Sequence, residues 1–145
     1  MAESKSEQVL AALYTALKNG LSGVTVERNS SLPERIPAGG LVILRDGKPG
    51  EAEFIFSPPT YFYEHLAEVD VIVDGANSAA RDAAFDAIKT AIASALAADR
   101  TLGGLVDYAL GENPSPLEIE EPGAESLKAA TITVVLPYDT SDPLV

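Results

Sequence analysis

The sequence contains no cysteine and only one histidine, His65, among its 145 residues. Without cysteine the chain can form no disulfide, no thiolate nucleophile and no thiolate zinc site, and one histidine cannot build a multi-histidine centre. Redox chemistry and structural zinc are therefore excluded, and neither a cofactor nor a metal is expected. The core must be held together by packing or by association.

Long apolar runs and a basic targeting segment are also missing. The N-terminal residues, MAESKSEQVLAAL, are polar and acidic, and no stretch reaches the roughly 18 apolar residues typical of a membrane span. We expect a protein that is neither exported by a standard signal nor anchored in a membrane, with the cytoplasm as its default compartment.

Basic residues are scarce, with 10 Lys and Arg against 22 Asp and Glu, which gives a formal net charge of −12. This balance disfavours attraction to nucleic acid or to an anionic lipid surface, because both carry phosphates of the same sign. Two interpretations stay open: the charge serves solubility alone, or it repels DNA that comes near.

The length predicts a single domain over 1–145. Ser4 and Glu7 fit a capping box that starts a helix over 5–19, and Asn77 or Ser78 can cap a second, longer helix that runs to Arg100. The stripe Phe85, Ile88, Ile92, Ala95 and Leu96 should face the core of the domain.

Extended segments fill the rest of the chain. A short strand is expected over 24–28, a polar loop over 29–40, and a hairpin between 41–45 and 52–56 with its tip at 46–50, where Asp-Gly and Pro-Gly pairs occur. Two later strands are expected over 106–110 and around 130–136, followed by a loose tail from about 139.

The segment 57–75 alternates along its length. His65, Ala67, Val69, Val71 and Val73 share one face, which should pack on the core, whereas the opposite face, with Leu66, Glu68, Asp70, Ile72 and Asp74, should be mostly solvated. A sheet with one wetted face is usually antiparallel. The predicted fold is therefore α+β, with two helices packed on one face of a mixed, mostly antiparallel sheet.

No catalytic motif emerges. The pair Gly103-Gly104 follows a helix and precedes an extended segment, which is the reverse of a phosphate-binding loop, so it predicts a helix-exit turn. No serine has a nucleophile elbow, and His65 lies in an alternating strand, where a packing or edge role is favoured over that of a base. The acids Glu118, Glu120, Glu121 and Glu125 lack a calcium-loop register and predict a solvated acidic loop.

The aromatic run Tyr61, Phe62 and Tyr63 follows two prolines. Aromatic side chains beside rigid turns are common at protein interfaces, because they offer a large contact area at a low entropic cost. Covering one end of the core is an equally good explanation of the run.

The order of segments along nearly the whole chain resembles that of the tail terminator, or tail completion, proteins of long-tailed bacteriophages, the class that includes minor tail protein U. The resemblance is carried by these segments: SEQVLAALYTALKN, LVILRDGKPGEAEF, YFYEHLAEVDVIVDG, ARDAAFDAIKTAIASALAADRTLGG and AATITVVLPYDT. It implies a mixed α/β fold and a structural role without catalytic residues.

That resemblance implies a homohexameric ring in the virion tail that caps the tail tube, ends its polymerisation and joins the tail to a head-side connector or stopper protein. DNA passes through such a ring without specific binding. We expect its lumen to carry the acids Glu68, Asp70, Asp74, Glu118, Glu120 and Glu121, which would repel phosphate. Contacts with the tube or the next subunit are expected at the loop 29–40 and at Arg45, Asp46, Lys48, Glu51, Tyr61, Phe62 and Tyr63.

Three alternatives to the tail terminator role remain. Another neck, connector or tail tube protein would share the structural role, but a tube subunit would polymerise with itself. A small enzyme of the acyltransferase type would need a nucleophile and a base in a pocket. A cytosolic adaptor of α+β fold would remain a monomer or a two-fold dimer.

Overall fold

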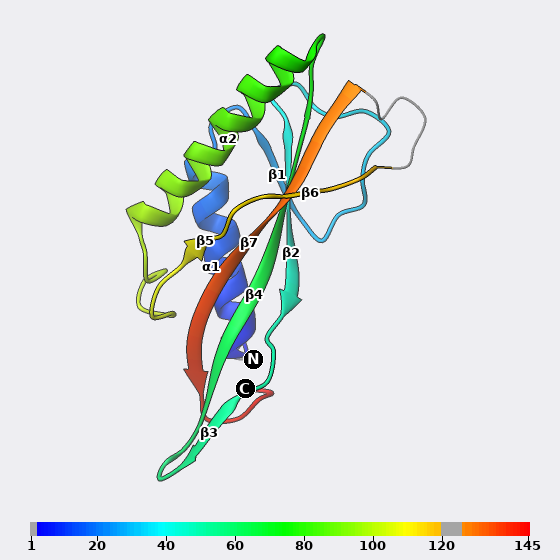
Figure 1. The fold of residues 1–145 in the computed structure, drawn as a ribbon. Helices are drawn as coiled ribbons and strands as arrows, with labels where there is room; N and C mark the ends of the chain where they lie inside the picture. Colours follow the sequence, from blue (N-terminus) through cyan, green and yellow to red (C-terminus); the bar gives the residue numbers. More distant parts are fainter. Residues whose placement is uncertain (1–2, 120–125) are drawn as a thin grey trace.

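A computed structural model describes residues 3–119 and 126–145 of the chain. The elements occur in this order: α1 (Lys5–Gly20), β1 (Thr25–Arg28), β2 (Leu41–Lys48), β3 (Glu53–Phe56), β4 (Pro59–Asp74), α2 (Ser78–Ala98), β5 (Leu110–Gly111), β6 (Ser115–Pro116) and β7 (Leu127–Thr140). The strands form one seven-stranded sheet with the central order β1-β2-β4-β7-β5, in which β3 also pairs with β4 and β6 with β7 (Figure 1).

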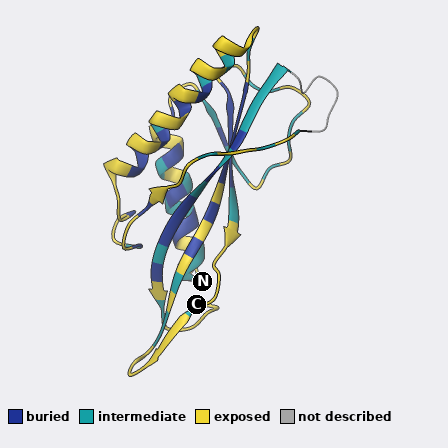
Figure 2. Cartoon of the chain, viewed as in Figure 1, coloured by how far each residue is buried: buried dark blue, intermediate teal, exposed yellow. Residues whose placement is uncertain are grey.

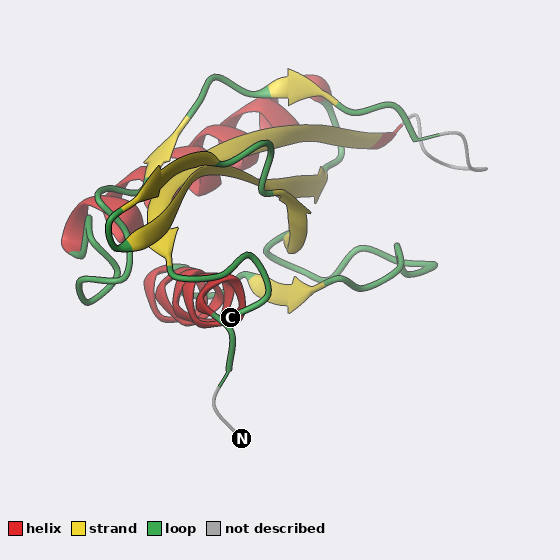
Figure 3. Cartoon of the chain, turned by 90° about the horizontal axis from the view of Figure 1, so that it is seen from below, coloured by secondary structure: helices red, strands yellow, loops and turns green. Residues whose placement is uncertain are grey.

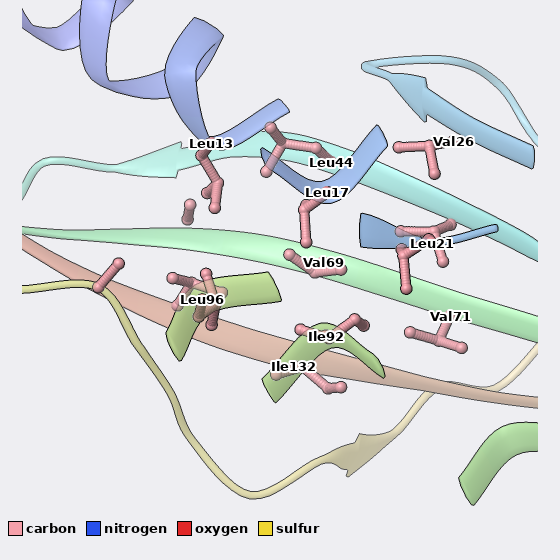
Figure 4. Close-up of a cluster of buried hydrophobic side chains, with 14 of the residues drawn as sticks. Leu13, Leu17, Leu21, Val26, Leu44, Val69, Val71, Ile92, Leu96 and Ile132 are labelled. Atoms are coloured by element: carbon pink, nitrogen blue, oxygen red, sulfur yellow. The ribbon is translucent and has the colours of Figure 1, made fainter. Parts of the chain in front are cut away.

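The sheet is mixed, because β1 runs parallel to β2 while the other described pairs are antiparallel. Both helices pack on the same face, since their buried side chains share one cluster with one face of β2, β4 and β7. Figure 4 shows this cluster, in which Leu13 and Leu17 of α1 and Ile92 and Leu96 of α2 meet Val69 of β4. The predicted α+β class is confirmed.

The first helix begins as its sequence predicts. The Ser4 hydroxyl accepts a hydrogen bond from the Glu7 backbone N–H at 3.3 Å, which satisfies one of the unpaired donors of the first turn. The Glu7 carboxylate does not complete the capping box, because it pairs with Arg28 instead. The helix ends at Gly20, where an added Cβ would lie 2.6 Å from the Ala95 Cβ, so glycine lets the two helices approach closely.

The second helix is capped by Asn77, whose side chain accepts from the Ala80 backbone N–H at 2.9 Å. Its five buried residues are those of the predicted stripe. The helix ends at Ala98, slightly earlier than expected, and the chain then turns through Gly103 and Gly104, whose φ angles are 71° and 89°. The prediction that the two glycines form a helix-exit turn is confirmed.

The strand predicted over 106–110 is wrong. Residues 101–107 form consecutive turns and a bend, and β5 comprises Leu110 and Gly111 alone. Val106 and Ala109 are nevertheless buried in the core. The Arg100 guanidinium holds this segment by donating to the Ala109 carbonyl at 2.8 Å. The apolar character of the segment therefore reflects burial of irregular chain rather than strand pairing.

The hairpin predicted between 41–45 and 52–56 is also wrong. Both β2 and β3 pair with β4, with Leu44 opposite Val69 and Phe54 opposite Tyr61, so they follow one another along the same edge. At the expected tip, the register between β2 and β4 shifts between Arg45 and Lys48. Gly47, which lies between Arg45 and Lys48, has a φ of 67°, so the Asp-Gly pair forms a bulge rather than a turn. The chain reverses direction only after Phe56, between β3 and β4.

One face of β4 is buried as predicted, from His65 to Val73 (Figure 2). The opposite face is only partly solvated. Leu66, Glu68 and Asp74 are exposed, but Asp70 and Ile72 are buried, which corrects the prediction for these two residues. Ile72 forms a second apolar cluster with Leu41 and Ile43, against which Leu32 and Ile36 of the loop and Ile119, Leu127 and Ala129 pack.

The last strand, β7, contains the predicted centre 130–136 and pairs with β4 along its full length, from Leu127 opposite Asp74 to Thr140 opposite Tyr61. It continues to Thr140, one residue past the expected start of the tail. At the end where it pairs with β3, β4 extends beyond the helices (Figure 1). Figure 3 looks along this direction from below, with α1 seen nearly end-on.

Candidate assembly surface

The residues predicted to contact the tail tube divide into two groups. Arg45 and Asp46 are held by ion pairs within the subunit: the Arg45 Nε donates to Asp70 at 2.7 Å, and an Asp46 oxygen accepts from the Arg28 guanidinium at 3.0 Å. Lys48 and Glu51 are exposed and lie just past the bulge. The second group forms no ion pair among the described residues, and its contact with another protein stays a prediction.

Arg28 ties the first helix to the sheet. Its two terminal nitrogens donate to the two Glu7 oxygens at 2.7 and 2.9 Å, a bidentate arrangement that fits the planar guanidinium. Through its other contacts the same side chain reaches Asp46 on β2. The hydrogen bonds from Arg28 lower the pKa of the Glu7 carboxyl, and the pKa of Arg28 is correspondingly raised.

Asp70 is one of the six acids assigned to a lumen, and its side chain is 8% exposed. One of its oxygens accepts from Arg45, and the other accepts from the Thr131 hydroxyl at 2.7 Å. Its charge is therefore compensated within the subunit, which explains why a carboxylate is tolerated at a buried position. Glu68, Asp74 and Glu118 are exposed, whereas Glu120 and Glu121 lie outside the described residues.

His65 is buried between the sheet and the bulge, as its predicted packing role requires. Its Nε2 lies 2.6 Å from the Asp46 carbonyl oxygen, which can only accept, so Nε2 carries the proton. In the neutral ring, Nδ1 then accepts from the Tyr138 hydroxyl at 3.0 Å. Burial raises the pKa of Tyr138 to about 12, with a further contribution from Tyr63. With both ring nitrogens bonded inside the protein, the histidine has a structural role.

The three aromatic residues after the prolines differ in their surroundings. Tyr63 packs against the core, with its ring centroid 5.8 Å from that of Tyr138, whereas Tyr61 stacks on Phe54 of β3 at 4.6 Å. Phe62 is 39% exposed. The core explanation therefore holds for Tyr63, and an interface role for the exposed Phe62 stays a prediction.

Sequence reasoning missed a run of three consecutive exposed apolar residues, Phe54, Ile55 and Phe56. We define the arm as residues 53–62, which comprise β3, the turn after it and the start of β4. The arm projects beyond the helices (Figure 1). All four residues of β3 are exposed, and Phe56 reaches 80%. In the sequence, Phe54, Ile55 and Phe56 are three consecutive apolar residues. A strand with one buried face would instead alternate apolar and polar residues.

Three clefts have residues of α2 in their lining, and one of them is lined by Ala84 and the loop residues 35–40. Another, of about 620 Å³, runs between the two helices and is lined mainly by small residues such as Ala12, Ala16 and Ala98. The third, of about 280 Å³, lies between α2 and the strands β5 and β7, where Ile92, Leu96 and Ile132 line it together with Lys89 and Arg100.

Within residues 3–119 and 126–145, no group of three or more His, Asp and Glu side chains is arranged to hold a metal ion. None of the helices in this part of the chain is long and apolar enough to cross a membrane.

Comparison of the sequence with protein-family models and with curated proteins finds no match. The fold, in contrast, is similar to that of solved structures. A chain in the virion of a native gene transfer agent particle superposes with a TM-score of 0.57 at 15% identity, covering 96% of this chain and 100% of that one. The protein has the fold of a virion chain.

A second similar structure is described as the sheath/tube terminator of an extracellular contractile injection system in its extended state. It superposes with a TM-score of 0.44 at 10% identity, and the alignment covers 98% of this chain and 59% of that chain.

Proposed function

We propose that the protein is a structural component of a phage-type tail, whose subunits form a ring that caps the tail tube, ends its polymerisation and joins the tail to a head-side connector. The observation that carries this proposal is the similarity of fold to a virion chain over 96% of this chain and 100% of that one. The order of sequence segments, which resembles that of tail terminators, supports the same role.

The surface fits assembly better than catalysis. The single histidine is bonded on both ring nitrogens within the protein, and the arm carries three consecutive exposed apolar residues, Phe54, Ile55 and Phe56. Monomeric proteins rarely leave contiguous apolar side chains in water, and such patches mark contacts with other proteins. Self-association into a closed ring requires two different patches on each subunit.

DNA would pass through the ring without specific binding. Three of the acids assigned to the lumen, Glu68, Asp74 and Glu118, are exposed and have no ion pair among the described residues, so their charges are available to repel phosphate. Asp70 is not suited to this role because its charge is compensated by Arg45.

The role is tested by adding the purified protein to a polymerising preparation of the cognate tail tube protein and measuring tube length by electron microscopy. A terminator stops growth and appears as one added ring at a tube end. Continued growth with the protein bound along the tube would favour a tube subunit, and an absence of binding would remove the terminator role.

Light scattering on the same sample tests the ring. The proposal predicts a species of six times the 15.1 kDa chain mass, either in free solution or on the tube end. A protein that remains a monomer or a two-fold dimer under both conditions would support an adaptor instead.

A further inference from the structure

The arm presents apolar side chains that the subunit itself leaves uncovered. Phe54, Ile55 and Phe56 are 40%, 48% and 80% exposed, and the ring of Phe54 packs edge-on against that of Phe56 at 4.8 Å. Phenylalanine at the tip of a hairpin gives a large contact area with few rotatable bonds to immobilise.

The arm carries one carboxylate, Glu53, and two more, Glu51 and Glu64, flank it; residues 49–64 contain no lysine or arginine. All three are exposed, and none forms an ion pair among the described residues. A partner surface must therefore combine an apolar recess with positive charge.

The cleft between α2 and the strands β5 and β7 meets both conditions. Its apolar lining comprises Ile92, Leu96 and Ile132, which are nearly fully buried, and Leu110, which is 51% exposed. An apolar cavity of about 150 Å³ holds one benzene ring. The 280 Å³ of this cleft therefore accommodate a phenylalanine side chain.

The rim of this cleft is positively charged on balance. Lys89 and Arg100 lie on it, against one carboxylate, Glu112. The described partner of the Arg100 side chain is a neutral carbonyl, that of Ala109, so its charge stays uncompensated. Lys89 has only an exposed contact with Asp86 at 3.4 Å, which solvent screens.

We propose that the arm of one subunit docks in this cleft of a second copy of the chain, with Phe56 in the apolar recess and Glu53 facing Lys89. The arm and the cleft are different patches of one subunit, so the contact is heterologous and closes into a ring if the rotation between subunits permits. The inference rests on the proposed ring and assigns its contact surfaces. The cleft between α1 and α2 is a poorer match because the only charged residue lining it is Asp99, which repels the arm.

The absence of cysteine from the chain makes a direct test possible. Ser57→Cys on the arm, which keeps Phe56, and Ala93→Cys on the rim of the cleft are combined in one protein, with each single variant as a control. Under mild oxidation, with and without tail tubes, the double variant should give a ladder of covalent oligomers on a non-reducing gel. Each single variant should give at most a dimer. Failure of the double variant to give a ladder under both conditions would overturn the proposal.

A charge-reversal pair tests the same contact without oxidation. Glu53→Lys and Lys89→Glu should each reduce the oligomer fraction about tenfold or more at a fixed subunit concentration, and the double variant should recover most of it. Additive losses without recovery would contradict the predicted pairing.

If rings persist in all variants, another surface forms the ring and the proposed function stands. If the wild-type chain makes no ring in solution or on tubes, the proposed function itself fails.

Discussion

Replacing Asp70 by asparagine tests whether this acid serves the fold rather than a charged lumen. The change keeps an acceptor for the Thr131 hydroxyl but removes the charge that Arg45 approaches at 2.7 Å. Hydrogen bonds to charged groups contribute about 1.5 to 3 kcal/mol. The Arg45 side chain is 38% exposed and can regain water, so we expect a loss near the lower end, about 2 kcal/mol.

Glu68→Gln is the matched control. Glu68 lies two residues away on the same face of β4, is exposed and has no ion pair among the described residues. Its neutralisation should change stability by less than about 0.5 kcal/mol.

The assay is thermal unfolding at one fixed protein concentration, because association shifts the melting temperature. For a chain of this size, about 1 kcal/mol corresponds to about 3 °C, so Asp70→Asn should lower Tm by about 6 °C and Glu68→Gln by less than about 2 °C. Equal small shifts in the two variants would refute the assignment of Asp70 as a buried, compensated charge.

Three further predictions concern the ion pair of α1, the bulge and the arm. Because Arg28 lowers the pKa of Glu7 in the folded state, this carboxylate stabilises the fold above its unfolded pKa, near 4.5, and the contribution is lost as the pH falls below that value. Glu7→Gln should therefore cost about 0.5 kcal/mol at neutral pH and less in acid, and a constant deficit from pH 7 to 3 would contradict this. Gly47→Ala should destabilise far more than Gly103→Ala in denaturant unfolding: both positions have positive φ, but only at Gly47 would the new Cβ collide with the Leu66 carbonyl. Phe56→Ser should leave the unfolding free energy of the monomer within about 0.5 kcal/mol of wild type while reducing self-association in sedimentation, and unchanged association would argue against an adhesive arm.

Sequence patterns predicted the elements that depend on near neighbours. The caps at Ser4 and Asn77 bond to residues three positions away, and the buried stripe of α2 repeats with the period of the helix itself. The alternation from His65 to Val73 likewise reports one strand with one face on the core.

The failures share a different cause. The glycine of an Asp-Gly pair favours a positive φ, which suits both a tight hairpin turn and a β-bulge. Which of the two forms depends on whether β3 pairs with β2 or, as here, with β4. The burial of Asp70 could not be read from its strand, because its hydroxyl partner, Thr131, lies 61 residues further along the chain.

The sequence by itself therefore determined the two helices, the core face of the long strand, the glycine exit turn and the acidic balance, since each follows from local geometry or from composition. The tertiary structure decided which carboxylates are buried and which are free, where the aromatic residues project, and which cleft carries positive charge. These properties arise from pairings between distant segments, whose register is set only when the sheet assembles and the helices cover one of its faces.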